Sequence, residues 1–153
     1  MKMLIALDDS EYAMKVVDYV ASTAKPAFFN ITLFTVMPLV SSNLEKEFAL
    51  PHFSEKLVEL KWLASEKKKM AKEMVKKCKT ILLDAGFPDD KIEVKIQNKE
   101  IGIAQDIIAE ARKGDYDTLV VGRRGLSATA AFVLGSVSNK IVQSIRNRTL
   151  WLV

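Results

Sequence analysis

Apolar residues along the chain fall into short continuous runs, separated by longer stretches in which they recur at helical spacing. The run at 3–7 is continuous and predicts a strand that is buried on both faces of a parallel sheet. Three further apolar-rich runs, at 31–37, 118–121 and 150–153, also predict strands. A fifth strand is expected at 92–97, where apolar and polar residues alternate as in a strand with one exposed face near a sheet edge.

The stretches between the runs predict helices at 11–25, 54–85, 103–113 and 134–145. Ser10 is expected to be the N-cap of the first helix, because serine is among the residues preferred at that position. The core-facing stripe of the second helix is expected to comprise Met70, Met74, Val75, Cys78, Ile81, Leu82 and Ala85. Residues 38–53 are rich in proline and small polar residues and are interpreted as a long loop, which is either functional or simply mobile.

This order of elements predicts an α/β protein with a single domain spanning 1–153. Its core would be one open, doubly wound sheet of five mainly parallel strands, with helices on both faces. Such sheets bind ligands beyond the carboxyl ends of the strands, where the strand order reverses. Asp8, Met37 and Gly122 stand at the ends of predicted strands and are therefore candidate ligand positions.

Composition narrows the class of protein further. The chain is 49% hydrophobic and 27% charged, which favours a globular fold. No apolar run approaches the ~20 residues of a membrane span, and the amino terminus lacks a signal-peptide pattern, so a cytoplasmic location is expected. The single cysteine, Cys78, is interpreted as a buried structural thiol, and the lone His52 offers no zinc site.

Lysines crowd one segment of the second predicted helix, at positions 67, 68, 69, 72, 76, 77 and 79, and the net charge of the chain is +4. A patch that binds nucleic acid or an anionic membrane is one interpretation. The other is the solvated face of a surface helix. The second is favoured because phosphate-binding surfaces usually mix arginine and aromatic residues with lysine, and this segment has neither. We therefore expect neither nucleic acid nor membrane as a partner.

The segment from Gly122 to Ser136 contains three glycines, two at the end of a predicted strand and one at the start of a predicted helix. Glycine lets a backbone approach a ligand closely, and a helix amino terminus offers unpaired N–H groups that favour phosphate. Arg123 and Arg124 add guanidinium donors beside the same loop. The spacing matches neither the P-loop nor the dinucleotide-binding motif. The alternative is that the glycines only shape a tight turn.

The spacing Gly122-x2-Gly125-x9-Gly135-Ser136 resembles the ATP-binding signature of the universal stress protein family, G-x2-G-x9-G-[S/T]. The turn after the first strand, at 8–10, and the segment 116–122 are also similar to that family. The resemblance implies an adenine nucleotide alpha hydrolase-like fold, ATP (or ADP or AMP) as ligand, possible involvement of Mg²⁺, and a homodimer formed through the last strand, 149–153.

Carried over by position, the resemblance implies that Asp8 contacts the ribose and that Val36 and the backbone near Ala6 lie at the adenine. Glycine, serine and valine residues of the loop would hold the ribose and the phosphates. With the two arginines, the candidate nucleotide site comprises Ala6, Leu7, Asp8, Val36, Gly122, Arg123, Arg124, Gly125, Leu126, Gly135, Ser136, Val137 and Ser138.

Two positions depart from the family pattern. Asp9 stands where glycine is more common, so its carboxylate would either weaken anion binding or help to hold a divalent metal. The last strand contains Trp151 in place of the usual Pro-Val-Leu run, and this side chain would bury in a dimer.

Three functions are weighed: a nucleotide-binding regulatory protein with at most slow hydrolysis, an ATP-hydrolysing enzyme, and an interaction module that binds no nucleotide. The first is favoured because the sequence shows no evident catalytic base.

Overall fold

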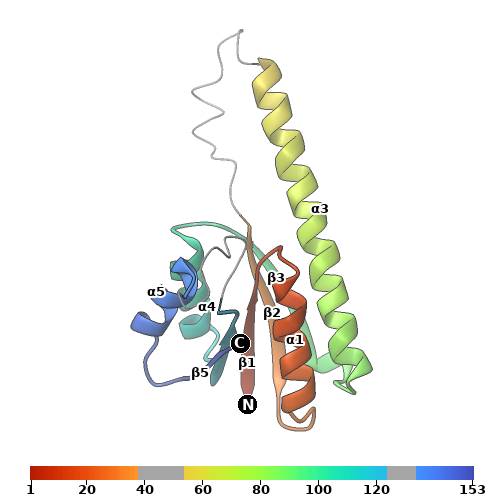
Figure 1. Ribbon diagram of the computed structural model, residues 1–153, viewed down its shortest axis with the longest axis vertical. Helices are drawn as coiled ribbons and strands as arrows, with labels where there is room; N and C mark the ends of the chain where they lie inside the picture. Colours follow the sequence, from red (N-terminus) through yellow and green to blue (C-terminus); the bar gives the residue numbers. More distant parts are fainter. Residues whose placement is uncertain (38–53, 124–133) are drawn as a thin grey trace.

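The computed structural model describes residues 1–37, 54–123 and 134–153, and in these residues the chain forms one five-stranded sheet (Figure 1). The strands are β1 (Lys2–Leu7), β2 (Asn30–Met37), β3 (Ile92–Asn98), β4 (Thr118–Val121) and β5 (Thr149–Leu152). They lie in the order β3-β2-β1-β4-β5, and every neighbouring pair is parallel. The predicted α/β fold is confirmed, and β3 occupies an edge as its alternating pattern indicated.

The helices cover both faces of the sheet. They are α1 (Tyr12–Thr23), α3 (Ser54–Asp84), α4 (Ile103–Lys113) and α5 (Ser136–Ser144), and a short 3₁₀ turn, η2 (Asp89–Lys91), precedes β3. Helices α1 and α3 pack on one face, and α4 and α5 on the other (Figure 1). The chain runs outward from β1 through β2 to β3 and then returns to β4, so the strand order reverses between β1 and β4.

The packing of the central strand β1 explains why its sequence is apolar throughout. Met3 and Ile5 pack on the α1 and α3 side, whereas Leu4 packs on the α4 and α5 side, and all three are fully buried. A strand that is covered by helices on both faces has no face exposed to water, so β1 lacks the alternation of apolar and polar residues found in β3.

The start of α1 differs from the prediction. The N-cap is Glu11, without a side-chain cap hydrogen bond, so the expectation that Ser10 caps this helix is wrong. The hydroxyl of Ser10 donates instead to Asp8 at 2.6 Å. Asp8 also accepts from the backbone N–H of Ser10 at 3.2 Å, which forms an Asx turn between strand and helix. The helix predicted at 11–25 is confirmed, and its core-facing side consists of the buried Ala13, Val16, Val17 and Val20.

The buried stripe of α3 is shifted by one residue at its start. Ala71, Val75, Cys78 and Leu82 are buried at spacings of four and three, and Met74 and Ile81 pack partly against the same core. The expectation that Met70 faces the core is wrong, because its side chain is 57% exposed. Ala85 is also exposed, because α3 ends at Asp84.

The amino-terminal half of α3 projects beyond the sheet (Figure 1), and Val58 and Trp62 are more than 60% exposed there. The helix has 31 residues and is therefore about 46 Å long, since each residue adds about 1.5 Å. The lysines at positions 67, 68, 69, 72, 76 and 77 are exposed, and Lys79 forms an ion pair with Asp89 at 2.6 Å. The long loop predicted at 38–53, with His52, lies outside the described residues.

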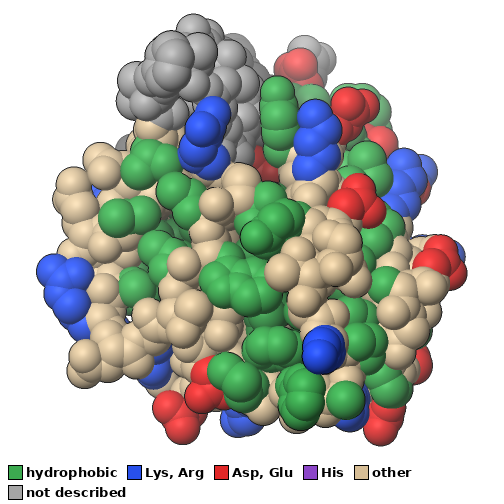
Figure 2. Space-filling view, turned by 60° about the horizontal axis from the view of Figure 1, so that its bottom comes forward, with side chains coloured by type: hydrophobic (Ala, Val, Ile, Leu, Met, Phe, Trp, Pro, Cys, Tyr) green, Lys and Arg blue, Asp and Glu red, His purple; other side chains and the backbone are tan. Residues whose placement is uncertain are grey.

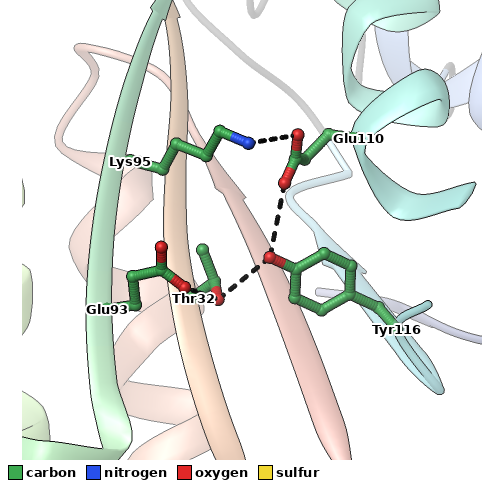
Figure 3. Close-up of polar contacts among 5 residues, drawn as sticks. All are labelled: Thr32, Glu93, Lys95, Glu110 and Tyr116. Carbon is green, nitrogen blue, oxygen red and sulfur yellow. Dashed lines mark hydrogen bonds and ion pairs between the residues drawn. The ribbon is translucent and has the colours of Figure 1, made fainter. Parts of the chain in front are cut away.

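A polar cluster lies between β2, β3 and α4, near the ends at which the strands begin (Figure 3). Glu110 is buried and forms an ion pair with Lys95 at 2.5 Å. The Tyr116 hydroxyl lies 3.4 Å from the Glu110 carboxylate and 3.1 Å from the Thr32 hydroxyl, and Thr32 donates to Glu93 at 3.3 Å. Each buried polar group of this cluster therefore has a partner, which limits its desolvation cost.

That end of the molecule carries hydrophobic side chains in the middle of its surface and charged ones around the rim (Figure 2). Met1 and Phe28 are both more than 60% exposed, and the Met1 amino group donates to the Phe28 carbonyl at 2.9 Å. This surface lies opposite the carboxyl ends of the strands, where sheets of this kind bind their ligands.

Candidate functional site

The candidate site lies where the strand order reverses, at the carboxyl ends of β1 and β4. Ala6 of β1 is paired with Val121 of β4, and Leu7 is paired with Thr35 of β2. Continuing these registers places Asp8 level with Val36 on one side and close to the start of the glycine loop on the other. The topology thus brings together three segments that are far apart in the sequence.

Asp8 is the polar side chain at the end of β1. Its Oδ1 accepts both hydrogen bonds from Ser10; Asp8 is half-buried and Ser10 is buried. These two bonds fix the orientation of the carboxylate and occupy one oxygen. Oδ2 makes no hydrogen bond with the described residues and is able to accept one from a hydroxyl-bearing ligand.

The end of β4 is held against the start of α5 by two hydrogen bonds. The buried hydroxyl of Ser138 donates to the carbonyl oxygen of Gly122 at 2.6 Å. The N–H of Gly135 donates to the carbonyl oxygen of Arg123 at 3.0 Å. Gly122 and Gly135, which are separated by 12 residues in the sequence, therefore lie side by side at the same edge of the sheet.

The amino terminus of α5 is built without a side-chain cap. Gly135 is the N-cap, and no side chain makes a capping hydrogen bond there. The carbonyl oxygen of Gly135 accepts the first helical hydrogen bond, from the N–H of Asn139, at 2.9 Å. The N–H groups of Ser136, Val137 and Ser138 have no partner within the helix. Together with the helix dipole they favour a negative charge in front of the helix. Ser136 is exposed there and adds a hydroxyl.

An apolar surface adjoins these polar groups. Val36 is buried on the α4 and α5 side of the sheet, and Ala6 and Val137 pack partly on the same side. The side chain of Leu7 belongs to the opposite core, beneath α1, so Leu7 offers the site only its backbone. The arrangement therefore combines an apolar wall, an oriented carboxylate and an anion-favouring helix terminus.

Of the residues expected in the site, the structure places Ala6, Leu7, Asp8 and Val36 at the ends of β1 and β2, and Gly122, Arg123, Gly135, Ser136, Val137 and Ser138 at the end of β4 and the start of α5. Arg124, Gly125 and Leu126 lie outside the described residues. The hydroxyl of Ser138, which the resemblance places among the ligand contacts, is engaged with the protein itself. Sequence reasoning missed the part that Ser10 plays in orienting Asp8, although the spacing Asp-x-Ser is a common Asx-turn signal.

No group of three or more histidine, cysteine, aspartate or glutamate side chains that could hold a metal ion occurs among the described residues. A hollow of about 420 Å³ lies at the opposite end of the sheet, beside the cluster of Figure 3, and is lined by Thr32, Glu93, Glu110 and Tyr116 among others. It is remote from the candidate site at Asp8 and Gly135.

The described part of the chain contains no helix with the length and apolarity that crossing a membrane requires.

The fold defines a doubly wound α/β protein, and the candidate site lies at the switch point of its sheet. The model of the universal stress protein family matches residues 1–150, and the chain belongs to that family. Universal stress protein YxiE of Bacillus subtilis is 26% identical over an alignment of 146 residues, which covers 93% of this chain and 91% of that protein.

Solved structures agree with this assignment of the fold. Universal stress protein UspA from Lactobacillus plantarum matches with a TM-score of 0.77 and 15% identity, over 100% of this chain and 97% of that one. The universal stress protein from Archaeoglobus fulgidus in complex with dAMP matches with a TM-score of 0.63 and 18% identity, over 99% and 96% of the two chains. Other matching family structures are complexes with AMP, from Arabidopsis thaliana, and with cAMP.

Proposed function

We propose that this chain is a cytoplasmic, nucleotide-binding regulatory protein that binds ATP, or ADP or AMP, at the crevice between β1 and β4. The observation that carries the proposal is the juxtaposition of the oriented Asp8 carboxylate with the uncapped amino terminus of α5. The hydroxyl groups of a ribose can donate hydrogen bonds to the Asp8 carboxylate, and the amino terminus of α5 favours the negative charge of phosphates. The dAMP, AMP and cAMP complexes of related structures support an adenine nucleotide as ligand.

Each part of the crevice matches one part of such a ligand. Val36 and Ala6 supply the apolar wall for the adenine, and Asp8 the acceptor for the ribose. Gly135, Ser136 and Val137 present backbone N–H groups and one hydroxyl to the phosphates. From the sequence pattern alone, Gly122 supports the ribose, Gly125 and Leu126 belong to the phosphate loop, and Arg123 and Arg124 add positive charge.

The approach of phosphates to Gly135 explains why glycine suits that position. Its φ of −58° and ψ of 154° are accessible to any L-amino acid, so the backbone conformation does not require glycine. We infer instead that a side chain at this N-cap would hinder phosphates from approaching the free N–H groups of the first turn. We therefore assign Gly135 to close approach of the nucleotide.

Binding rather than efficient hydrolysis is the proposed activity. Hydrolysis of ATP requires a group that orients water and charges that stabilise the transition state. The candidates evident in the sequence are Asp8, Asp9, Arg123 and Arg124, and in the structure one oxygen of Asp8 is bonded to Ser10. We expect phosphate release no faster than in Gly135→Ala with Mg²⁺ present. A wild-type rate well above that background would favour the enzyme.

The proposed homodimer uses the open edge of β5, which has β4 on one side only in the described sheet. Trp151 packs edge-on against Tyr19 and Phe29 of its own chain, with ring centroids 6.1 and 6.5 Å away, so its indole is already partly covered in the monomer. Leu152, 40% exposed, is the apolar side chain that an added strand would cover. Leu152→Lys should weaken self-association in sedimentation equilibrium, whereas Val142→Lys on α5, at 39% exposure, should not.

Nucleotide binding is tested with Asp8→Ala and the matched control Asp18→Ala, whose carboxylate lies on the exposed side of α1. Equilibrium dialysis should show weaker binding of ATP and of adenosine to the first variant, because the ribose contact is common to both ligands. The control should match the wild type. Equal affinity of Asp8→Ala and wild type for both ligands would remove Asp8 from the site.

A further inference from the structure

The carboxyl end of β5 continues the sheet into the first residues of the glycine loop. Beyond the last strand pair, Val121 with Leu152, the N–H of Val153 donates to the carbonyl of Val121 at 3.1 Å. The carbonyl of Val153 then accepts from the N–H of Arg123 at 2.5 Å. Val153 therefore lies opposite Gly122, the first glycine of the loop.

Arg123 is bonded on its other side to the start of α5. Its carbonyl oxygen accepts from the N–H of Gly135, the N-cap residue, at 3.0 Å. Arg123 thus connects the end of β5 to the amino terminus of α5 through its own N–H and carbonyl. The bond from Ser138 to the Gly122 carbonyl, at 2.6 Å, holds the peptide unit that contains the Arg123 N–H.

We propose that Val153 is a positioning residue for the phosphate end of the nucleotide site, acting through the main chain of Arg123 on Gly135. The inference rests on the proposed nucleotide binding. It adds that hydrogen bonds from the edge strand β5 affect the affinity for the nucleotide. The adenosine end, at Asp8, Val36 and Ala6, is built on β1 and β2 and has no bond to Val153 among the described residues.

The backbone nature of these contacts gives a matched pair of variants. Val153→Ala keeps the N–H and the carbonyl and should behave as wild type. Val153→Pro removes the N–H and places a ring carbon against the Val121 carbonyl, which displaces residue 153 from Arg123. Leu152 is already in a strand, the conformation favoured before proline, so the rest of the fold should be retained.

The experiment compares the affinities of wild type, Val153→Ala and Val153→Pro for ATP and for adenosine by calorimetric titration. Val153→Pro should bind ATP roughly two- to tenfold more weakly, which corresponds to the net worth of one hydrogen bond. Its affinity for adenosine should stay within about twofold of wild type, whereas a general loss of structure would lower both. Equal losses for ATP and adenosine, or no loss for ATP, would overturn the proposal.

A second measurement needs no ligand. Hydrogen exchange of the Arg123 and Gly135 amides, followed by NMR, should be slow in wild type and Val153→Ala and at least several-fold faster in Val153→Pro. If wild type binds no ATP, the proposed function fails, and amide exchange alone then decides the positioning role. Unchanged exchange at Gly135 in Val153→Pro would overturn that role, whatever the result with ATP.

Discussion

The hydroxyl of Ser138, on the first turn of α5, donates a 2.6 Å hydrogen bond to the carbonyl oxygen of Gly122 at the end of β4. Ser138 is 5% exposed, so this bond is shielded from water. It fixes how the helix terminus stands against the strand end, which is the geometry that the candidate site requires.

Replacing Ser138 by alanine should therefore affect stability as well as binding. Loss of a buried donor leaves the Gly122 carbonyl without this partner, and we expect the free energy of unfolding in urea to fall by about 1–3 kcal/mol. ATP affinity should fall too, because Gly122 is displaced. Ser136→Ala is the matched control: its exposed hydroxyl should contribute to ATP binding, while stability stays within about 0.5 kcal/mol of wild type. Unchanged stability of Ser138→Ala would contradict the account.

The corrected stripe of α3 leads to a second prediction. Leu82 is fully buried, whereas Met70 is 57% exposed. Leu82→Ala should lower the free energy of unfolding by about 2–5 kcal/mol, because it leaves a cavity in the core. Met70→Ala should change it by about 0.5 kcal/mol or less. Comparable losses in the two variants, measured by urea denaturation, would show that the stripe runs through Met70 after all.

Cys78 should be unreactive in the native protein. Burial raises the pKa of its thiol to about 11, and the carboxylate of Asp18 acts in the same direction. Compared with the ordinary value of 9.0, the thiolate fraction at pH 8 is lower by about 100-fold. A disulfide reagent should therefore label Cys78 slowly in buffer and rapidly in urea. Fast labelling of the folded protein at pH 8 would show that the thiol is accessible.

Tyr116 gives a prediction on alkaline stability. Burial raises the pKa of its hydroxyl above the ordinary value of 10.0, and the carboxylates of Glu110 and Glu93 add to this although the bond with Thr32 opposes it. The unfolded chain then loses its proton at a lower pH than the folded one, so stability is full below pH 10 and declines as pH rises through the higher folded value. Urea denaturation between pH 8 and 11 should show a smaller decline for Tyr116→Phe.

The same variant also separates stability from function. Tyr116→Phe removes the contacts with Thr32 and Glu110 and should cost about 1 kcal/mol at pH 8. The cluster of Figure 3 lies toward the amino ends of the strands, whereas the candidate site lies at their carboxyl ends, so ATP affinity should not change. A large loss of ATP affinity would indicate coupling across the sheet that the contacts do not account for.

Much of the fold could be predicted because each local signal agrees with the topology. The apolar run of β1 reflects burial on both faces, and the alternation in β3 reflects its place at the edge. Met70 was misplaced because Met70 and Ala71 are both apolar, and periodicity alone does not decide which of two adjacent residues faces the sheet. Ser10 was misplaced because a serine before a helix can cap it or bond backward, and Asp8 supplies the backward acceptor.

The candidate site was proposed from the sequence, whereas the hydrogen bonds that hold its ends were not. The glycine spacing and the strand ends identified Asp8, Gly122 and Gly135 from the sequence. The bonds from Val153 to Arg123 and from Ser138 to Gly122 depend on how β5 and α5 pack beside β4, which no local pattern specifies. Backbone bonds of this kind leave no residue-type signal, because any amino acid except proline can supply the N–H.

The most direct test of nucleotide binding is calorimetric titration of ATP with Mg²⁺ into the wild-type protein and Gly135→Ala. The φ of −58° at Gly135 accepts alanine, so the variant should fold and its loss of binding can be assigned to the site. The account predicts saturable binding of one ATP per chain by the wild type and binding at least tenfold weaker by the variant. No saturable binding by the wild type, or equal binding by both proteins, would contradict it.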